Sequence, residues 1–342
     1  MLVCRASTTD GLGHLMRSRA VSQAFSKIGE TLLVVIGSSQ LRSLIGDATV
    51  NYRIVESEEA ALAIGNEFSP EIVVFDMLRI TSKTYDEMTR NTMSVNLSPV
   101  FTHWNQANLF FHRTKYPDPT WPSENDTAIR SGLKYATIGS HCTRISANDF
   151  RRNMLRPTLS LAVSMGGADA SNKTLQVVRE VSRIPQKMTL WVMLGEGYAH
   201  SYQDFVDCIR DSQHEIILAK TKDSMWQILG RCSLVILAGG TTTYEATYAG
   251  LPSINLLSTP KHFFLIQELV EEKVGFYAND AGQSDLGRTV DLINQLEKNR
   301  EELYLMHKHA KNLVDEKGVH RIAEETIQFY IKNWLRSGIR AA

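Results

Sequence analysis

Short runs of β-branched and other apolar residues alternate along the chain with longer stretches whose apolar positions recur at helical spacing. In the first half, the short runs predict strands at residues 2–5, 31–36, 51–55, 72–75 and 93–96. The clearest helical stretch lies between the first two of these strands, at residues 13–28. Strands that alternate with helices are typical of parallel sheets joined by crossover helices, so the first half predicts a doubly wound α/β domain.

The same alternation begins again in the second half of the chain, with strands expected at residues 159–164, 189–194, 215–218, 234–237 and 253–256. A chain of 342 residues exceeds what one hydrophobic core usually supports. We therefore expect a GT-B-like α/β fold, with two Rossmann-like doubly wound domains that face each other across a cleft, at residues 1–155 and 156–342. The last amphipathic stretch, residues 319–335, predicts a helix that packs on either domain, including back on the N-terminal one.

Composition narrows the function classes. Hydrophobic residues make up 43% and charged residues 22%, which is typical of a folded globular protein. Lysine plus arginine and aspartate plus glutamate both number 37, so no global basic field is present to bind nucleic acid. No apolar run approaches the ~20 residues of a membrane helix, which leaves only peripheral membrane association. The four cysteines are far apart and form no C-x-x-C pair, so we expect reduced thiols in the cytoplasm.

Three glycine-bearing turns each follow a predicted strand and precede a predicted helix, at residues 10–14, 165–169 and 238–245. At the carboxyl end of a parallel strand, glycines let the backbone approach a ligand, and the next helix presents free N–H groups and a positive dipole end to phosphate. The two turns of the second half open on the same edge of one sheet, so we expect a diphosphate there.

The predicted substrate-binding residues lie in or just after these turns, where Glu245 is expected to accept hydrogen bonds from ribose hydroxyls. They are Gly11, Gly13, Arg17, Gly166, Gly167, Asp169, Asn172, Gly239, Gly240, Thr241, Thr242, Thr243 and Glu245. The competing interpretation of each turn is a tight strand-to-helix connection without a ligand, in which Thr241 caps the helix and Glu245 is a dipole partner.

His14 stands at the start of the first helix, where the positive end of the dipole disfavours a protonated ring. The sequence therefore predicts a general base at His14, with Asp10 orienting the ring and Arg17 reaching a phosphate. Asp76 ends the strand at residues 72–75 and should face the cleft by the same edge rule. His14, Asp10 and Asp76 are the predicted catalytic residues. Structural alternatives are a His14 that packs the first turn and an Asp76 that caps the next helix.

Three segments carry a resemblance to a known family: Arg5-x-Ser7 with Gly11-x-Gly13-His14-x-x-Arg17, residues 163–169, and residues 239–245. This pattern resembles the UDP-sugar hydrolases of the pseudaminic acid pathway and the related spore-coat polysaccharide proteins of the GT-B superfold. The resemblance implies that the second domain binds the nucleoside diphosphate and that the first binds the sugar or acceptor. It also implies that His14 matches the histidine that activates the attacking water.

The resemblance and the glycine turns together predict an enzyme of surface polysaccharide or glycan biosynthesis that cleaves the glycosyl-phosphate bond of a UDP-sugar or another nucleotide sugar. The family's hydrolases carry a tyrosine where this chain has Leu78, which favours glycosyl transfer, with hydrolysis by water as the alternative. A non-catalytic nucleotide-sugar-binding protein is the second alternative. A dinucleotide oxidoreductase is disfavoured because Met16 replaces the third glycine of G-x-G-x-x-G. No metal and no cofactor are expected, because helix N-termini can hold the diphosphate and no D-x-D motif is present.

Overall fold

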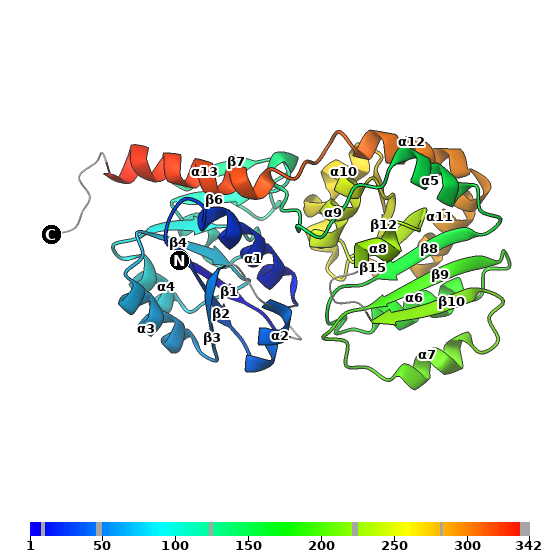
Figure 1. Ribbon diagram of the computed structural model, residues 1–342, viewed down its shortest axis with the longest axis horizontal. Helices are drawn as coiled ribbons and strands as arrows, with labels where there is room; N and C mark the ends of the chain where they lie inside the picture. The colour runs from blue at the N-terminus through cyan, green and yellow to red at the C-terminus, as the bar shows by residue number, and fades with distance from the viewer. Residues whose placement is uncertain (8–10, 46–49, 123–125, 221–224, 281–282, 336–342) are drawn as a thin grey trace. The chain divides into compact units, whose positions relative to one another are not determined.

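The computed structural model describes residues 1–7, 11–45, 50–122, 126–220, 225–280 and 283–335 (Figure 1). The chain divides into two compact units, of which the first comprises Met1–Ile138 with the C-terminal segment from Glu316, and the second comprises Gly139–Asp315. Each unit contains a parallel sheet with alternating helices, so the predicted α/β class is confirmed.

The division between the units differs from the predicted domain boundary at residue 156. Helix α5 (Ala147–Met154) contacts strand β8 (Leu159–Ser164) and helix α12 (Arg300–Ala310), which all belong to the second unit. Asn153 adds another contact within this unit, because its side-chain amide donates to the carbonyl of Gly230 at 2.8 Å. The polar segment before β8 therefore lies within the second unit and is not the boundary between the units.

The first sheet has the strand order β3-β2-β1-β4-β5-β6-β7, and all its pairs are parallel. Its strands are β1 (Leu2–Arg5), β2 (Leu32–Ile36), β3 (Asn51–Val55), β4 (Ile72–Asp76), β5 (Met93–Asn96), β6 (Leu109–His112) and β7 (Ala128–Ser131). Its helices are α1 (Gly13–Phe25), α2 (Arg42–Ile45), α3 (Glu58–Phe68), α4 (Ser82–Thr89) and α13 (Gly318–Tyr330). The strand order reverses direction between β1 and β4, as in doubly wound folds.

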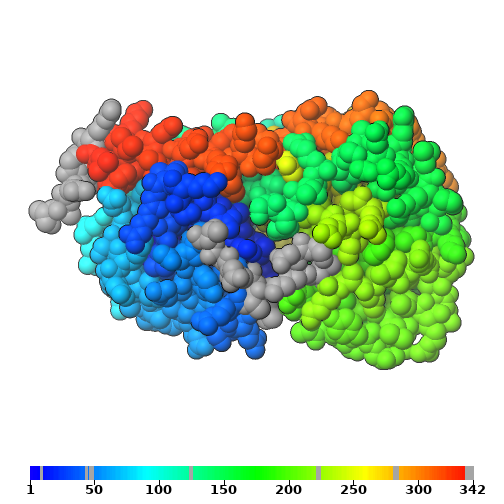
Figure 2. Space-filling model, viewed as in Figure 1, coloured from blue at the N-terminus to red at the C-terminus, as the bar shows by residue number. Residues whose placement is uncertain are grey.

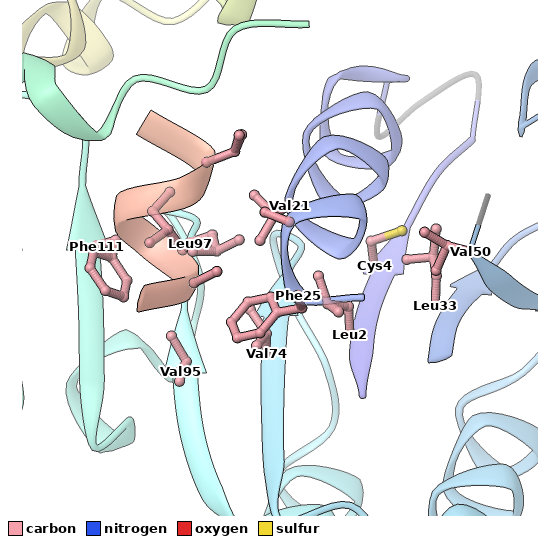
Figure 3. Packing of buried hydrophobic residues seen from close by; sticks show 14 of the residues in the cluster. Leu2, Cys4, Val21, Phe25, Leu33, Val50, Val74, Val95, Leu97 and Phe111 are labelled. Carbon is pink, nitrogen blue, oxygen red and sulfur yellow. The ribbon is translucent and has the colours of Figure 1, made fainter. Parts of the chain in front are cut away.

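The pleat of β1 distributes its side chains to two cores. Leu2 and Cys4 point to the face covered by α1 and α13, and Val3 points to the face covered by α3 and α4. Figure 3 shows Val21 and Phe25 of α1 directed at the strand residues of the first face. Both faces are buried, which explains why the central strands are continuous apolar runs.

The C-terminal helix α13 belongs to the first unit, one of the two packings that the sequence left open. It contacts α1, and Tyr330 Oη donates to Glu71 Oε1 at 3.0 Å. Tyr135 Oη donates to Glu325 at 2.9 Å. In Figure 2 this helix, in orange and red, lies on the outer surface of the first unit. The chain therefore returns to complete the core in which it began.

The second sheet repeats the strand order of the first as β10-β9-β8-β11-β12-β13, again with parallel pairs. Its other strands are β9 (Met188–Leu194), β10 (Glu215–Lys220), β11 (Leu234–Leu237), β12 (Ser253–Asn255) and β13 (Gly275–Tyr277), and a short antiparallel pair follows as β14 (Asn279–Asp280) and β15 (Gln283–Ser284). Its other helices are α6 (Lys173–Val181), α7 (Tyr202–Ile209), α8 (Met225–Leu229), α9 (Thr241–Ala249), α10 (Gln267–Glu271) and α11 (Leu286–Lys298).

Candidate active site

His14 and Asp76 meet at the carboxyl edge of the first sheet. β1 pairs with β4 so that Cys4 lies opposite Asp76, and α1 begins just after the turn that follows β1. His14 Nδ1 lies 2.6 Å from Asp76 Oδ1. The Asp76 side chain is 1% exposed, whereas the His14 side chain is 12% exposed. The topology thus brings together two residues that are 62 positions apart in the sequence.

Arg17 binds the same carboxylate from the next turn of α1. Its Nε donates to Asp76 Oδ2 at 2.7 Å, and its Nη2 donates to Oδ1. Ser18 Oγ adds a 3.3 Å hydrogen bond to Oδ2. Burial raises the pKa of Asp76, but the charges and hydrogen bonds of Arg17 and His14 outweigh burial and hold this pKa at about 2. Asp76 is therefore an ionised, buried carboxylate.

An ionised Asp76 fixes the orientation of the His14 ring. A carboxylate only accepts hydrogen bonds, so His14 Nδ1 is the donor in this contact. In the uncharged ring, Nε2 then keeps its lone pair and can accept a proton. A histidine oriented by a buried carboxylate is the arrangement that general bases use.

The structure places the Arg17 side chain differently from the prediction. The Arg17 guanidinium is 6% exposed and directed at Asp76, so it lies on the carboxylate and not at an open phosphate site. Asp10 lies outside the described residues, and Asp76 makes the contact with the imidazole that was expected of Asp10. The spacing of His14 and Arg17 carried a signal for this, because residues three apart lie on one helix face.

The turn that precedes α1 is tight. Gly11 has φ +81°, and its N–H donates to the carbonyl of Ser7 at 2.9 Å. Gly13 is the first residue of α1 and directly precedes His14. Gly11 therefore serves this turn through its positive φ, because an added Cβ there would meet nothing within 4 Å.

The turn after β8 departs from prediction, because the first two N–H groups of α6 are bound by a side chain of the protein. Asp169 Oδ1 accepts from the N–H of Lys173 and Oδ2 accepts from the N–H of Thr174, both at 2.8 Å. Asn172 Oδ1 accepts from Tyr198 Oη at 2.8 Å. Asp169 and Asn172 thus stabilise α6 and its neighbouring loop from within the protein.

The glycines of this turn permit close backbone packing. Gly166 has φ +98°, and Gly167 lies against Gly195, where an added Cβ would be 2.3 Å from the Gly167 carbonyl oxygen. The N–H of Gly197 donates to the same oxygen at 3.0 Å. Gly167 therefore joins the loops after β8 and β9.

The turn after β11 keeps an uncapped helix start. Gly240 is the N-cap residue of α9 and has no side chain to accept from the N–H groups of Thr241 and Thr242, and no acidic residue stands in the first turn. Such N–H groups lack intrahelical partners. Thr243 is different, because it is buried and its Oγ1 donates to Asn255 Oδ1 at 2.8 Å. Of the two second-unit turns, this one therefore has the features of an anion site.

Glu245 lies one turn into α9 and is 8% exposed. Its Oε1 accepts from the N–H of Gly139 at 3.2 Å. Burial raises the pKa of Glu245 to about 7, against the lowering effect of the Gly139 N–H. At neutral pH this carboxyl can both donate and accept hydrogen bonds, which suits recognition of paired hydroxyls.

The two glycines of the α9 turn should respond differently to alanine. Gly239 has φ +76°, and an added Cβ would lie 2.0 Å from Leu257 Cδ2. Gly239→Ala is therefore expected to lower the free energy of unfolding by about 1–3 kcal/mol. Gly240→Ala is the matched control, because nothing lies within 4 Å of its added Cβ. Urea denaturation measures both, and equal stability of the two variants would contradict this account of the turn.

A cavity of about 420 Å³ lies elsewhere in the first unit. Its lining includes Asn108 and Thr127, which directly precede β6 and β7, together with Phe329 and Trp334. It therefore opens at the amino edge of the sheet, opposite the edge that carries His14 and Asp76. In α/β sheets ligands bind beyond the carboxyl ends of the strands, so the edge with His14 is the candidate catalytic site.

No group of three or more His, Cys, Asp or Glu side chains in the described ranges is arranged to hold a metal ion. No helix in the part of the chain that the structure describes combines the length and apolarity needed to cross a membrane.

Comparison with known sequences gives two distant relatives, and no protein-family model matches the chain. The chain is similar to an uncharacterized protein of Methanocaldococcus jannaschii, with 20% identity over 271 residues, or 75% of this chain and 54% of that protein. It is also similar to the spore coat polysaccharide biosynthesis protein SpsG of Bacillus subtilis, with 24% identity over 166 residues, or 48% of each chain. The chain thus spans about half the length of the curated relatives it matches.

Solved structures match over nearly the whole chain. Anabaena HepE in complex with UDP has a TM-score of 0.67 at 12% identity and covers 96% of this chain and 99% of its own. MurG of Acinetobacter baumannii has a TM-score of 0.66 at 11% identity, with coverage of 96% and 99%. A putative UDP-N-acetylglucosamine 2-epimerase of Listeria monocytogenes has a TM-score of 0.63 at 12% identity, with coverage of 97% and 96%. The predicted GT-B fold is confirmed.

Proposed function

We propose that this protein is an enzyme that binds a nucleotide sugar and cleaves its glycosyl-phosphate bond with His14 as general base. The observation that carries the proposal is the 2.6 Å contact between His14 Nδ1 and the buried Asp76, at the carboxyl edge of a sheet in a GT-B fold. The UDP in the HepE complex and the polysaccharide role in the name of SpsG support the substrate class.

The proposed reaction is a single displacement. His14 Nε2 removes the proton of an acceptor hydroxyl, and the hydroxyl oxygen attacks the anomeric carbon of the sugar. The bond between that carbon and the phosphate oxygen breaks, and the electron pair leaves with the nucleoside diphosphate. This displacement inverts the configuration at the anomeric carbon. A glycan hydroxyl as acceptor makes the protein a transferase, and water makes it a hydrolase.

The second unit supplies the diphosphate site in this proposal. The start of α9 combines the uncapped N–H groups of Thr241 and Thr242 with the positive end of the helix dipole. Both stabilise the negative charge that develops on the leaving group as the bond breaks. Glu245 is proposed to hold ribose hydroxyls. Asp169 and Thr243 have a structural role in this proposal, because the Asp169 side chain binds the start of α6 and the Thr243 side chain binds Asn255.

A thermal-denaturation panel tests the substrate class. The protein is heated with UDP, GDP, CDP, dTDP, ADP, the corresponding nucleosides, representative sugar derivatives and NAD. We expect one diphosphate and its sugar derivative to raise the Tm, since a ligand at 100 times its Kd stabilises the fold by ~2.7 kcal/mol. The matching nucleoside is the control and should raise the Tm less. A shift with NAD and with none of the diphosphates would point to a dinucleotide oxidoreductase and contradict the proposal.

A further inference from the structure

The cavity at the amino edge of the first sheet is lined mostly by polar residues. The 3₁₀ turn η2 (Trp104–Gln106) supplies Asn105 and Gln106, and Asp126 lies two residues before β7. These three residues are exposed. Their side chains form no hydrogen bond or ion pair with other residues in the described ranges. The cavity therefore presents two carboxamides and a carboxylate that are not used to hold the fold.

A third carboxamide in the lining, that of Asn108, is held in one orientation. Its Oδ1 accepts from the N–H of Ser94 at 2.8 Å and from Ser94 Oγ at 3.0 Å. The backbone N–H of Asn108 donates to Ser94 Oγ at 3.1 Å. Ser94 is 2% exposed, so these bonds anchor Asn108 to the protein interior. With Oδ1 fixed, the two Nδ2 hydrogens of Asn108 are preorganised donors for a ligand.

The C-terminal segment adds an aromatic ring to these amides. Phe329, in the last turn of α13, lines the cavity and is partly buried, because it packs against the core on the α1 face of the sheet. The helix continues as the π-helical turn η5 (Ile331–Leu335), in which Asn333 Nδ2 donates to the carbonyl of Phe329 at 3.1 Å. Such π-helical turns are rare and occur frequently at functional sites.

The chemistry of the lining matches a neutral saccharide. Pyranose hydroxyls both donate and accept hydrogen bonds, as carboxamides do, and Asp126 adds acceptors for further hydroxyls. The C–H face of a pyranose is apolar and can pack on a ring such as Phe329. Among the described residues of the lining, Asp126 alone is charged, which disfavours a phosphate or another anion. The volume of about 420 Å³ is that of a small-molecule site.

We propose that this cavity is a non-catalytic binding site for a neutral saccharide, whose hydroxyls bind the amides of Asn105, Gln106 and Asn108 while one ring face packs on Phe329. The cavity lies at the sheet edge opposite His14, so the inference does not depend on the proposed function. A second contact of this kind raises the effective concentration of a glycan chain at the protein.

The test titrates the full chain with the methyl glycosides of glucose, galactose, mannose, rhamnose and N-acetylglucosamine, followed by NMR signals of the ligand. We expect at least one glycoside to bind with a Kd on the order of 1 mM. The double variant Asn105→Ala, Gln106→Ala should weaken its binding about 5- to 30-fold, because two hydrogen bonds are lost. The double variant Asn66→Ala, Asn91→Ala removes two exposed amides elsewhere in the first unit and should match the parent.

A second pair of variants tests the aromatic contact. Phe329→Tyr keeps the ring and should retain most of the affinity for the glycoside, whereas Phe329→Leu keeps an apolar side chain without the ring and should weaken binding. Equal binding by the two variants would contradict packing of the sugar on this ring.

The outcomes separate this site from the proposed function. Failure of all five glycosides to bind overturns the saccharide site and leaves the proposed function standing. Binding that Asn105→Ala, Gln106→Ala does not weaken also overturns it, because the sugar then lies elsewhere on the protein. Uridine is titrated as a neutral ligand of another class, and its binding in place of every glycoside would contradict a saccharide. A protein that binds a glycoside here but none of the nucleoside diphosphates fails the proposed function alone.

Discussion

Replacing His14 by glutamine is expected to lower kcat for nucleoside diphosphate release by about 10²- to 10⁴-fold, the usual contribution of a general base. Glutamine is close in size and keeps hydrogen-bonding groups near Asp76, but it cannot take a proton from an acceptor hydroxyl. The proposed diphosphate site lies on another set of residues, so UDP affinity should stay within about threefold of the parent. Steady-state rates of release from the nucleotide sugar and calorimetric titration with UDP measure the two quantities.

His320→Gln is the control for this substitution, because His320 is an exposed histidine of α13 in the same unit. It should keep the parental kcat and UDP affinity. Full activity of His14→Gln would show that His14 takes no part in the chemistry. Loss of UDP affinity without a change in kcat would instead assign His14 to ground-state binding.

Replacing Arg17 by methionine is expected to lower the free energy of unfolding by about 3–5 kcal/mol, the cost of leaving one partner of a buried ion pair uncompensated. The Asp76 carboxylate is 1% exposed and would lose the two guanidinium hydrogen bonds. Urea denaturation at neutral pH measures the effect. Arg90→Met, at an exposed arginine after α4, is the control and should change stability by less than about 0.5 kcal/mol.

The effect of Arg17→Met should shrink as the pH falls. In the parent, the pKa of Asp76 lies at about 2, below the ordinary aspartate value, so its contribution to stability is complete above about pH 4 and is lost as the pH falls toward 2. Without Arg17, one charge and its hydrogen bonds no longer offset the effect of burial, so the pKa of Asp76 rises. The variant then takes up a proton at Asp76 in mildly acidic solution, which relieves the buried charge. A destabilisation that stays constant from pH 7 to pH 4 would contradict this explanation.

The double variant Arg17→Met, Asp76→Asn separates the charge from the packing. It removes both members of the ion pair, so no charge remains buried without a partner. We expect it to be more stable than Arg17→Met alone. Equal stability of the two variants would show that lost packing around the Arg17 side chain dominates.

Much of the fold followed from the alternation of strands and helices. The central strands of both sheets are short, buried on both faces and apolar, so their positions were predicted within a residue or two. The strands β6, β7 and β13 and the short pair β14 and β15 were missed. β6 contains the aromatic pair Phe110 and Phe111, which is equally typical of buried strands, helices and loops. β7 is a partly exposed edge strand with the sequence Ala-Ile-Arg-Ser. Periodicity does not distinguish such segments from loops.

The candidate site was predicted in part. His14 and Asp76 were chosen separately, from a helix start and a strand end, and their contact depends on β1 and β4 being neighbours in the sheet. The sequence placed Arg17 at a phosphate, because a buried carboxylate 59 residues away is not visible in the local pattern. Long-range partners determine what such side chains do.

The most direct test of the proposed chemistry is cleavage of the preferred nucleotide sugar in ¹⁸O-labelled water, with the released nucleoside diphosphate analysed by mass spectrometry. Attack at the anomeric carbon predicts that the diphosphate leaves with its own oxygen and carries no label, while any sugar released to water carries it. The His14→Gln variant should release little of either product. Label in the diphosphate would place bond cleavage at phosphorus, and this result would contradict glycosyl transfer from an anomeric carbon with His14 as its base.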